Sequence, residues 1–357
     1  MDYRKDNRLD ADRVGVAENV GNGVRGGSSQ AKITDVAAAA GVAPMTVSRV
    51  INTPDRVSPE TTARVRAAIE KLGYVPNLMA GGLSSRRSRM VAAIVPTIAH
   101  PMFAGLVQSF TDGMREAGYQ VILSLSGYNN DGDEAMVRTL LGRRPDAMLL
   151  TGSAFTPVAE QLLIESRIPI VQVWDRICTP IDMLVGFDHA ELGVAAAEHF
   201  LTKGHTRFAA VTAGDTRALA RTRAFTDRVR QAGAEVIAST VTTAPSSIVA
   251  GREALRNLAP RLTERTALFC SSDMLAFGVV TEARLLGIPV PDRLSICGFG
   301  NFELSSASVP PITTVSVEGI TSGRTAAEML LHRLSGDRSP AERVVAVPFA
   351  VIERETG

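Results

Sequence analysis

The chain has 357 residues, of which 45% are hydrophobic and 21% charged. These proportions are ordinary for a globular protein, and the length allows more than one domain. No apolar run approaches the roughly 20 residues that a membrane-spanning helix needs, which excludes a membrane protein of that kind. The first residues, Asp2–Arg13, are polar and charged and lack the apolar core of a signal peptide, so we expect a cytoplasmic location.

The three cysteines, Cys178, Cys270 and Cys297, form no CxxC pair and show no regular spacing. Closely spaced cysteines are the usual mark of a disulfide framework or a metal site. We therefore expect free, buried thiols, with no metal and no cofactor.

The formal net charge of +1 conceals an uneven distribution along the chain. Between residues 31 and 90, nine Lys or Arg residues stand against four Asp or Glu residues, which leaves +5 on this segment. A basic segment on a nearly neutral body is typical of a nucleic-acid contact. A solvated charged surface is the alternative, and charge by itself does not decide between them.

Three short helices are predicted between residues 33 and 73. The first is capped by Thr34 and ends at Gly41, the second covers Pro44–Ile51, and the third begins after a Ser58 cap. Two short helices joined by a turn that contains glycine are typical of a helix-turn-helix motif.

From Met90 onward, apolar runs alternate with helical patterns. The expected strands are 91–95, 120–125, 147–150, 170–173, 184–187, 208–211, 267–270 and 294–297, with helices such as 104–117 and 275–286 between them. Continuous apolar runs of this kind predict parallel, doubly wound α/β sheets, and their number predicts two lobes. The predicted organisation is a disordered tail (1–30), a helix-turn-helix domain (31–76), a hinge (77–88) and an α/β sensor domain (89–357).

The second helix carries the side chains best suited to reading DNA. Met45 and Arg49 are four residues apart and share a face, so Arg49 can bond a guanine while Met45 contacts a thymine methyl group. The hydroxyl groups of Thr46 and Ser48 suit phosphate oxygens, which fix register and not sequence. Val47 and Val50 of this helix are expected to face inward and pack on the first helix.

The segment from Ile33 to Asn77 resembles the head of the lactose-repressor (LacI) family nearly position for position. The motifs are Ile-Thr-Asp-Val-Ala at 33–37, Met-Thr-Val-Ser-Arg-Val at 45–50 and Leu-Gly-Tyr-Val-Pro-Asn at 72–77. The resemblance extends to about Glu353 and implies a homodimeric repressor of operator DNA with a small-molecule effector. The residues assigned to DNA are Thr34, Pro44, Met45, Thr46, Ser48, Arg49, Asn52, Asn77, Ala80 and Leu83.

In the resembled family, the hinge folds into a helix on DNA and inserts a leucine into the minor groove. Leu83 matches that leucine, and Ala80 matches a small residue before it. This sequence departs from the family at Gly81 and Gly82, since each glycine in a helix costs about 1 kcal/mol relative to alanine. A plain flexible linker is therefore an almost equal alternative.

The resemblance also implies a fold like that of periplasmic sugar-binding proteins, with three connections between lobes near Asp188, 312–317 and 338–344. The first lobe would comprise residues 89–188 and 316–339, and the second 189–315 and 340–357. The positions that match the family's effector contacts are Phe103, Thr151, Trp174, Phe187, Asp188, Arg221, Ser272, Asp273, Asn301 and Glu303.

Each effector assignment has a structural alternative. Trp174 and Phe187 could pack the lobes, Asp188 and Asp273 could cap helices, and Arg221 could be a surface residue. Gly300 stands where many relatives carry an Asp that binds neutral sugars, and the surrounding stretches look most like the gluconate-repressor branch. Loss of a carboxylate favours an anion, so we expect a sugar acid such as gluconate, with a neutral sugar or another small metabolite as the alternative.

An enzyme and a solute-binding protein are the two alternatives from other functional classes. An enzyme is disfavoured because the sequence has no phosphate-binding GxxxxGK[ST] loop, nucleophile elbow or HExxH motif. A solute-binding protein of transport systems would share the sensor but would not carry residues 31–83. No leucine heptad follows Val351, which favours dimers over tetramers.

Overall fold

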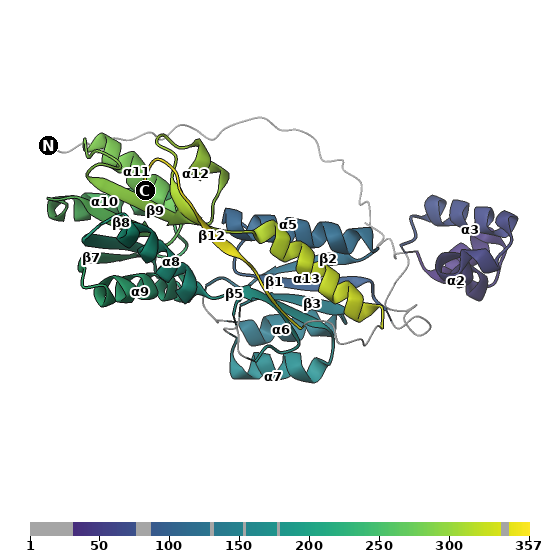
Figure 1. Ribbon diagram of the computed structural model, residues 1–357. Helices are drawn as coiled ribbons and strands as arrows, with labels where there is room; N and C mark the ends of the chain where they lie inside the picture. Colours follow the sequence, from purple (N-terminus) through teal and green to yellow (C-terminus); the bar gives the residue numbers. More distant parts are fainter. Residues whose placement is uncertain (1–30, 76–86, 129–131, 153–154, 177–178, 337–342) are drawn as a thin grey trace, which may run out of the picture. The chain divides into compact units, whose positions relative to one another are not determined.

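The computed structural model describes residues 31–75, 87–128, 132–152, 155–176, 179–336 and 343–357. The chain divides into two compact units, residues 1–85 and 86–357, which we call the head and the sensor (Figure 1). No helix within the described ranges is long and apolar enough to cross a lipid bilayer.

The described part of the head, residues 31–75, contains three α-helices, α1 (Ile33–Ala40), α2 (Pro44–Asn52) and α3 (Pro59–Leu72), with a 3-10 turn at Pro54–Arg56. Gly41 ends α1 in the left-handed region, at φ 64°, a conformation that glycine adopts without strain. The helices enclose a small core of Val36, Ala37, Ala40, Val47, Val50, Val65 and Ala68. The predicted helix-turn-helix is confirmed.

The caps of the head helices match the sequence prediction except at the start of α1. Ser58 caps α3 by accepting a hydrogen bond from the backbone N–H of Thr61 at 3.3 Å, as predicted. The prediction that Thr34 caps α1 was wrong, because α1 begins at Ile33 and Lys32 is its N-cap residue. The Lys32 N–H donates to the Asp35 carboxylate at 2.8 Å, and an acidic group is favourable in a first helical turn.

The first lobe of the sensor is built on a six-stranded parallel sheet with the order β11-β5-β4-β3-β1-β2. Its strands are β1 (Met90–Val95), β2 (Gln120–Leu125), β3 (Ala147–Thr151), β4 (Ile170–Asp175), β5 (Met183–Phe187) and β11 (Val344–Ala346). Every residue of β3 and β5 is buried, as expected for parallel strands covered on both faces.

The second lobe has a six-stranded sheet of its own, with the order β12-β10-β9-β8-β6-β7. Its strands are β6 (Arg207–Ala213), β7 (Glu235–Thr242), β8 (Thr266–Cys270), β9 (Leu294–Phe299), β10 (Thr313–Val317) and β12 (Phe349–Ile352). Only β12 runs antiparallel, beside β10. The fold class predicted from sequence, a helical head with a two-lobed α/β sensor, is confirmed.

A pair of helices covers each face of each sheet (Figure 1). In the first lobe, α5 packs with α13 and α6 packs with α7; in the second, α8 packs with α9 and α10 with α11. The bounds are α5 (Pro101–Glu116), α6 (Asp133–Gly142), α7 (Pro157–Ser166), α8 (His189–Thr202), α9 (Thr216–Gln231), α10 (Ile248–Leu258), α11 (Asp273–Leu285) and α13 (Gly319–Leu334). Two shorter helical segments complete the second lobe: η2 (Ala259–Arg261) and α12 (Glu303–Ala307).

The chain passes between the lobes three times. The first connection lies between β5 and α8, at Asp188, and the second between β10 and α13, at Glu318. The third lies between β11 and β12, after Ala346, and not at 338–344 as the sequence suggested. The reason is that Val344 pairs with Leu184 of β5, which assigns this short strand to the first lobe.

Four of the described strands were not predicted from the sequence: β7, β10, β11 and β12. Strand β7 lies at a sheet edge and is only partly buried, so it lacks a continuous apolar run. Strands β11 and β12 span three and four residues, too short to show a period. Part of the region predicted as a connection, residues 313–317, is strand β10.

Candidate functional site

Helix α2 presents its predicted DNA-reading side chains to solvent. Met45 is 64% exposed, and Pro44 and Arg49 are exposed as well. Val47 and Val50 lie in the core of the head, as predicted. The helix therefore has one face that holds the head together and another that is free to contact base edges.

The uncharged polar residues assigned to DNA differ in exposure. Thr34 and Asn52 are exposed, whereas Thr46 and Ser48 are half-buried. The Asn52 amide donates to the Ser48 carbonyl oxygen at 3.0 Å and lies 3.3 Å from its hydroxyl. The hinge assignments, including the predicted leucine wedge, lie outside the described residues: Asn77, Ala80, Gly81, Gly82 and Leu83.

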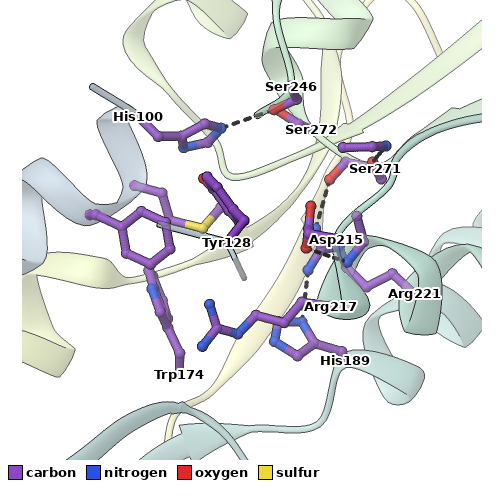
Figure 2. A pocket seen from close by; sticks show the side chains of 14 residues that line it. His100, Tyr128, Trp174, His189, Asp215, Arg217, Arg221, Ser246, Ser271 and Ser272 are labelled. Atoms are coloured by element: carbon purple, nitrogen blue, oxygen red, sulfur yellow. Dashed lines mark hydrogen bonds between the residues drawn. The ribbon is translucent and has the colours of Figure 1, made fainter. Parts of the chain in front are cut away.

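A cavity of about 470 Å³ lies between the two lobes of the sensor (Figure 2). It is lined by His100, Met102, Phe103, Tyr128 and Trp174 from the first lobe, by His189 at the first connection, and by Ala213, Asp215, Arg217, Ala218, Arg221, Ser246, Ser271 and Ser272 from the second. Four residues expected to contact an effector line it: Phe103, Trp174, Arg221 and Ser272. It sits at the carboxyl ends of parallel strands, where α/β proteins bind ligands.

Aromatic side chains form one wall of the cavity. Trp174, at the end of β4, is edge-on to Phe103 at 5.8 Å and to Phe187 at 5.2 Å between ring centroids. Phe187 supports the tryptophan from behind and does not line the cavity itself. The buried indole Nε1 of Trp174 has no hydrogen-bond partner among the described residues, so a donor is left over at this wall.

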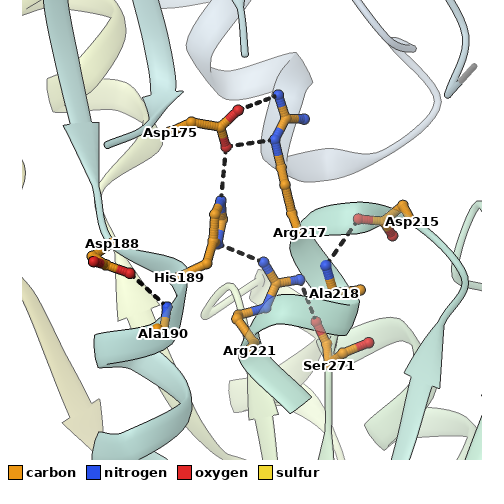
Figure 3. Close-up of polar contacts among 9 residues, drawn as sticks. All are labelled: Asp175, Asp188, His189, Ala190, Asp215, Arg217, Ala218, Arg221 and Ser271. Carbon is orange, nitrogen blue, oxygen red and sulfur yellow. Dashed lines mark hydrogen bonds and ion pairs between the residues drawn. The ribbon is translucent and has the colours of Figure 1, made fainter. Parts of the chain in front are cut away.

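Arg221, on α9, is only 6% exposed, and within the described residues its hydrogen-bond and ring contacts are neutral groups. One amino group bonds Nδ1 of His189 at 2.8 Å, and the other donates to the Ser271 carbonyl oxygen at 2.9 Å (Figure 3). The guanidinium carbon lies 4.0 Å from the centre of the Phe299 ring. Burial lowers the pKa of Arg221 to about 10, so it stays charged at neutral pH.

A second arginine on the same helix contacts a carboxylate across the cavity. Arg217 bonds both oxygens of Asp175, Nε at 2.7 Å and Nη2 at 3.2 Å, and His189 Nε2 lies 3.1 Å from the same carboxylate (Figure 3). Burial alone would raise the pKa of Asp175, but the hydrogen bond from His189 and the charge of Arg217 outweigh it. The pKa of Asp175 is therefore well below its usual value.

Three polar residues at the cavity come from separate loops. His100 Nε2 lies 3.1 Å from the Ser246 hydroxyl oxygen, and burial lowers the pKa of His100 to about 4. Burial and the nearby Asp215 raise the pKa of Tyr128 to about 12, which keeps the phenol neutral. Asp215 caps α9 by accepting from the Ala218 N–H at 3.0 Å.

Several residues predicted to contact an effector lie elsewhere. Asp188 caps α8 by accepting from the Ala190 N–H at 2.7 Å, the alternative that the sequence left open. Thr151 donates to the Ile94 carbonyl oxygen at 3.1 Å and lines a neighbouring cavity of about 500 Å³. Asn301 and Glu303 line a third cavity, of about 1040 Å³, near the second connection between the lobes.

Asp273 is fully buried inside the second lobe, away from the cavity. Its carboxylate accepts hydrogen bonds from the Ser305 hydroxyl at 2.5 Å, the Thr314 hydroxyl at 2.6 Å and the Phe302 N–H at 3.0 Å. The helix it begins is capped by its neighbour Ser272. Its position therefore suits a structural role in the lobe and not the effector contact we expected.

Most of the polar residues that line the cavity were not predicted from the sequence. Ser246 follows β7, which was not predicted as a strand, whereas His100, Tyr128 and Asp215 lie three to five residues beyond the predicted strands 91–95, 120–125 and 208–211. His189 and Asp175 stood next to predicted contacts, in Phe-Asp-His and Trp-Asp. Their adjacency to the ends of strands β5 and β4 was the signal that could have found them.

Comparison with known proteins places both units in one family. Residues 32–77 match the family of bacterial regulatory proteins of the lacI type, and residues 197–356 match a periplasmic binding protein-like domain. The HTH-type transcriptional regulator GntR of Pseudomonas aeruginosa is 31% identical over 326 residues, which cover 91% of this chain and 95% of that protein. The chain belongs to the LacI family. This LacI-family protein is a DNA-binding transcriptional repressor, and the resemblance seen in its sequence is confirmed.

Solved structures support the same assignment. A LacI-family transcriptional regulator from Silicibacter pomeroyi superimposes with a TM-score of 0.86 at 29% identity, covering 91% of this chain and 99% of that one. A lac repressor dimer bound to operator and the anti-inducer ONPF gives a TM-score of 0.78 over 92% and 99% of the two chains. At 22% identity, that second likeness shows the shared fold alone.

Proposed function

We propose that this LacI-family protein represses transcription as a homodimer in the cytoplasm and that a sugar acid, such as gluconate, controls it from the cavity between the lobes. The observation that carries the effector class is Arg221. A buried charge is costly unless an opposite charge compensates it. Asp215 and Asp175 act on this guanidinium only from a distance, and its hydrogen-bond and ring contacts among the described residues are all neutral. A ligand carboxylate would supply the missing partner through a bidentate contact.

The rest of the lining suits a carbohydrate. Two arginines and one aspartate line the cavity, and the Asp175 carboxylate pairs with one of these arginines, Arg217, so Arg221 is the arginine that lacks a carboxylate contact. His100 and His189 add no charge at neutral pH, because burial lowers the pKa of each to about 4. The hydroxyl groups of Ser246, Ser271 and Ser272 suit a polyol, and the Trp174 ring offers an apolar face.

The proposed mechanism couples two equilibria. Each head of the dimer reads half of a pseudo-palindromic operator, with Arg49 and Met45 at base edges. An effector that prefers one arrangement of the lobes shifts the population toward it by its differential affinity. A shift that separates the first lobes across the dimer would unseat the paired hinges and release the DNA.

A gel shift tests DNA binding by this protein, and calorimetry tests the proposed effector. The full chain should shift its own upstream DNA in a salt-sensitive manner, and sodium gluconate should bind and alter that shift. If calorimetry shows a heat of binding with glucose or ribose but none with gluconate, the effector is a neutral sugar and not a sugar acid. Absence of any preference for promoter DNA would favour a solute-binding protein instead.

A further inference from the structure

An ion pair joins the two lobes beside the proposed effector cavity. Asp175 ends strand β4 of the first lobe, and Arg217 lies in the first turn of α9 in the second lobe. Two nitrogens of the guanidinium contact the two carboxylate oxygens, at 2.7 and 3.2 Å. Both side chains are more than four-fifths buried, at 19% and 17% exposure, so solvent screens this pair less than a surface pair.

The first lobe has a notch that accommodates this guanidinium. A Cβ atom on Gly152 would lie 2.1 Å from Arg217 Nη2 and 3.0 Å from an Asp175 oxygen. Gly152 also has φ 95°, a conformation that other residues rarely adopt. In this arrangement the guanidinium of Arg217 occupies the space that a side chain at residue 152 would take.

We propose that Arg217 is a specificity-determining residue that exchanges Asp175 for the acid group of the effector. The inference rests on the proposed function. Arg217 lines the cavity, so a ligand carboxylate that reached it would lie close to the Asp175 carboxylate. Two carboxylates at close range in a partly desolvated site repel each other strongly. The Nε and Nη2 atoms of one guanidinium cannot bind both carboxylates at the same time.

The exchange leaves no carboxylate without a partner. His189 Nε2 lies 3.1 Å from the Asp175 carboxylate. When Arg217 turns to the ligand, Asp175 keeps this hydrogen bond. What is lost is the ion pair between the lobes, while the hydrogen bond from His189, the first residue of α8, remains. A neutral sugar does not compete for the guanidinium, so it fills the cavity without breaking the pair. Acid and neutral ligands thus differ in their effect on the lobes.

The test uses the full chain with sodium gluconate and glucose as probes in calorimetry. In Asp175→Asn the competing charge is gone, so gluconate should bind roughly tenfold more tightly while glucose affinity stays within about twofold. In Arg217→Met, gluconate affinity should fall by roughly tenfold and glucose affinity should again stay constant. Melting curves confirm that each variant is folded.

The matched control is Glu191→Gln. Glu191 pairs with Arg176 at 3.1 Å across the same connection, but both side chains are more than half exposed. This variant should change neither affinity.

The outcomes separate the two proposals. Gluconate binding that is unchanged or weaker in Asp175→Asn overturns the exchange and leaves the sugar-acid effector standing. A wild-type chain that binds glucose but not gluconate overturns the proposed effector, and the exchange with it.

Discussion

Arg221 and His189 lie 2.8 Å apart, and their hydrogen bond fixes the position of the histidine proton. A guanidinium only donates, so His189 Nδ1 must be the unprotonated, accepting nitrogen. Nε2 then carries the proton and donates to Asp175 at 3.1 Å. Burial is the main reason that the pKa of His189 is lowered to about 4, so the ring is neutral at physiological pH.

Stability should therefore fall in mild acid. His189 has a pKa of about 4 when folded and about 6.5 when unfolded, so the unfolded chain binds more protons between these values. The contribution is fully present above about pH 6.5 and is lost as pH falls toward 4. From pH 7 to pH 5 it amounts to about 2 kcal/mol in the free energy of unfolding, measured by urea titration.

The contribution of His189 can be separated from that of other residues by His189→Gln. A glutamine amide can donate to Asp175 and accept from Arg221, but it does not titrate. We expect a smaller loss of stability between pH 7 and pH 5 in this variant. Some pH dependence should remain, because burial also lowers the pKa of His100 and of His205 to about 4. An unchanged slope would contradict the neutral assignment.

Arg49→Ala should weaken operator binding without affecting the sensor. The side chain is exposed and buries no core surface, so the head should stay folded. A lost bidentate contact to a base is worth about 1–3 kcal/mol, or roughly five- to 150-fold in affinity. Gel shifts should show reduced discrimination between operator and random DNA, with gluconate binding intact. Loss of ligand binding as well would argue that the variant is misfolded.

Gly193→Ala should destabilise the sensor. A Cβ atom at Gly193, on α8, would lie 2.0 Å from the Arg221 carbonyl oxygen and 3.0 Å from the Phe225 N–H nitrogen of α9. Helix α9 must then move outward with its cavity arginines. Overpacking of this kind costs about 1–3 kcal/mol, which lowers the Tm by several degrees. Gluconate affinity should fall as well.

The matched control for this variant is Gly142→Ala. Gly142 also lies in a helix, and a Cβ atom there meets nothing within 4 Å. Alanine is the better helix former, so the Tm should stay constant or rise. Equal losses in both variants would argue against the close approach of α8 and α9.

Asp273→Asn should affect stability more than effector affinity. Asp273 accepts three hydrogen bonds inside the second lobe, and an amide offers only one acceptor oxygen. A buried donor left without a partner costs about 1–3 kcal/mol. Thermal melting should show the loss, while calorimetry with gluconate should stay within about twofold of the wild type. A large loss of affinity would restore the effector role first assigned to this residue.

The sequence by itself determined the elements and the family. Gly41, Ser58 and the turn residues around them mark the ends of the head helices through local backbone and capping preferences. Eight of the twelve strands that the structure describes are visible as apolar runs, because parallel strands in the middle of a sheet are buried on both faces. The motifs of the head were specific enough to identify a LacI-family repressor.

The cavity and the third connection were decided only by the tertiary structure. Asp175, His189, Arg217 and Arg221 come from a strand end and two helices, and their contacts depend on how two lobes meet across the cavity. Residues 344–346 belong to the first lobe because they pair with β5, some 160 positions earlier. Local preferences act over a few residues, whereas hydrogen bonds and ion pairs between distant segments form only once the chain has folded.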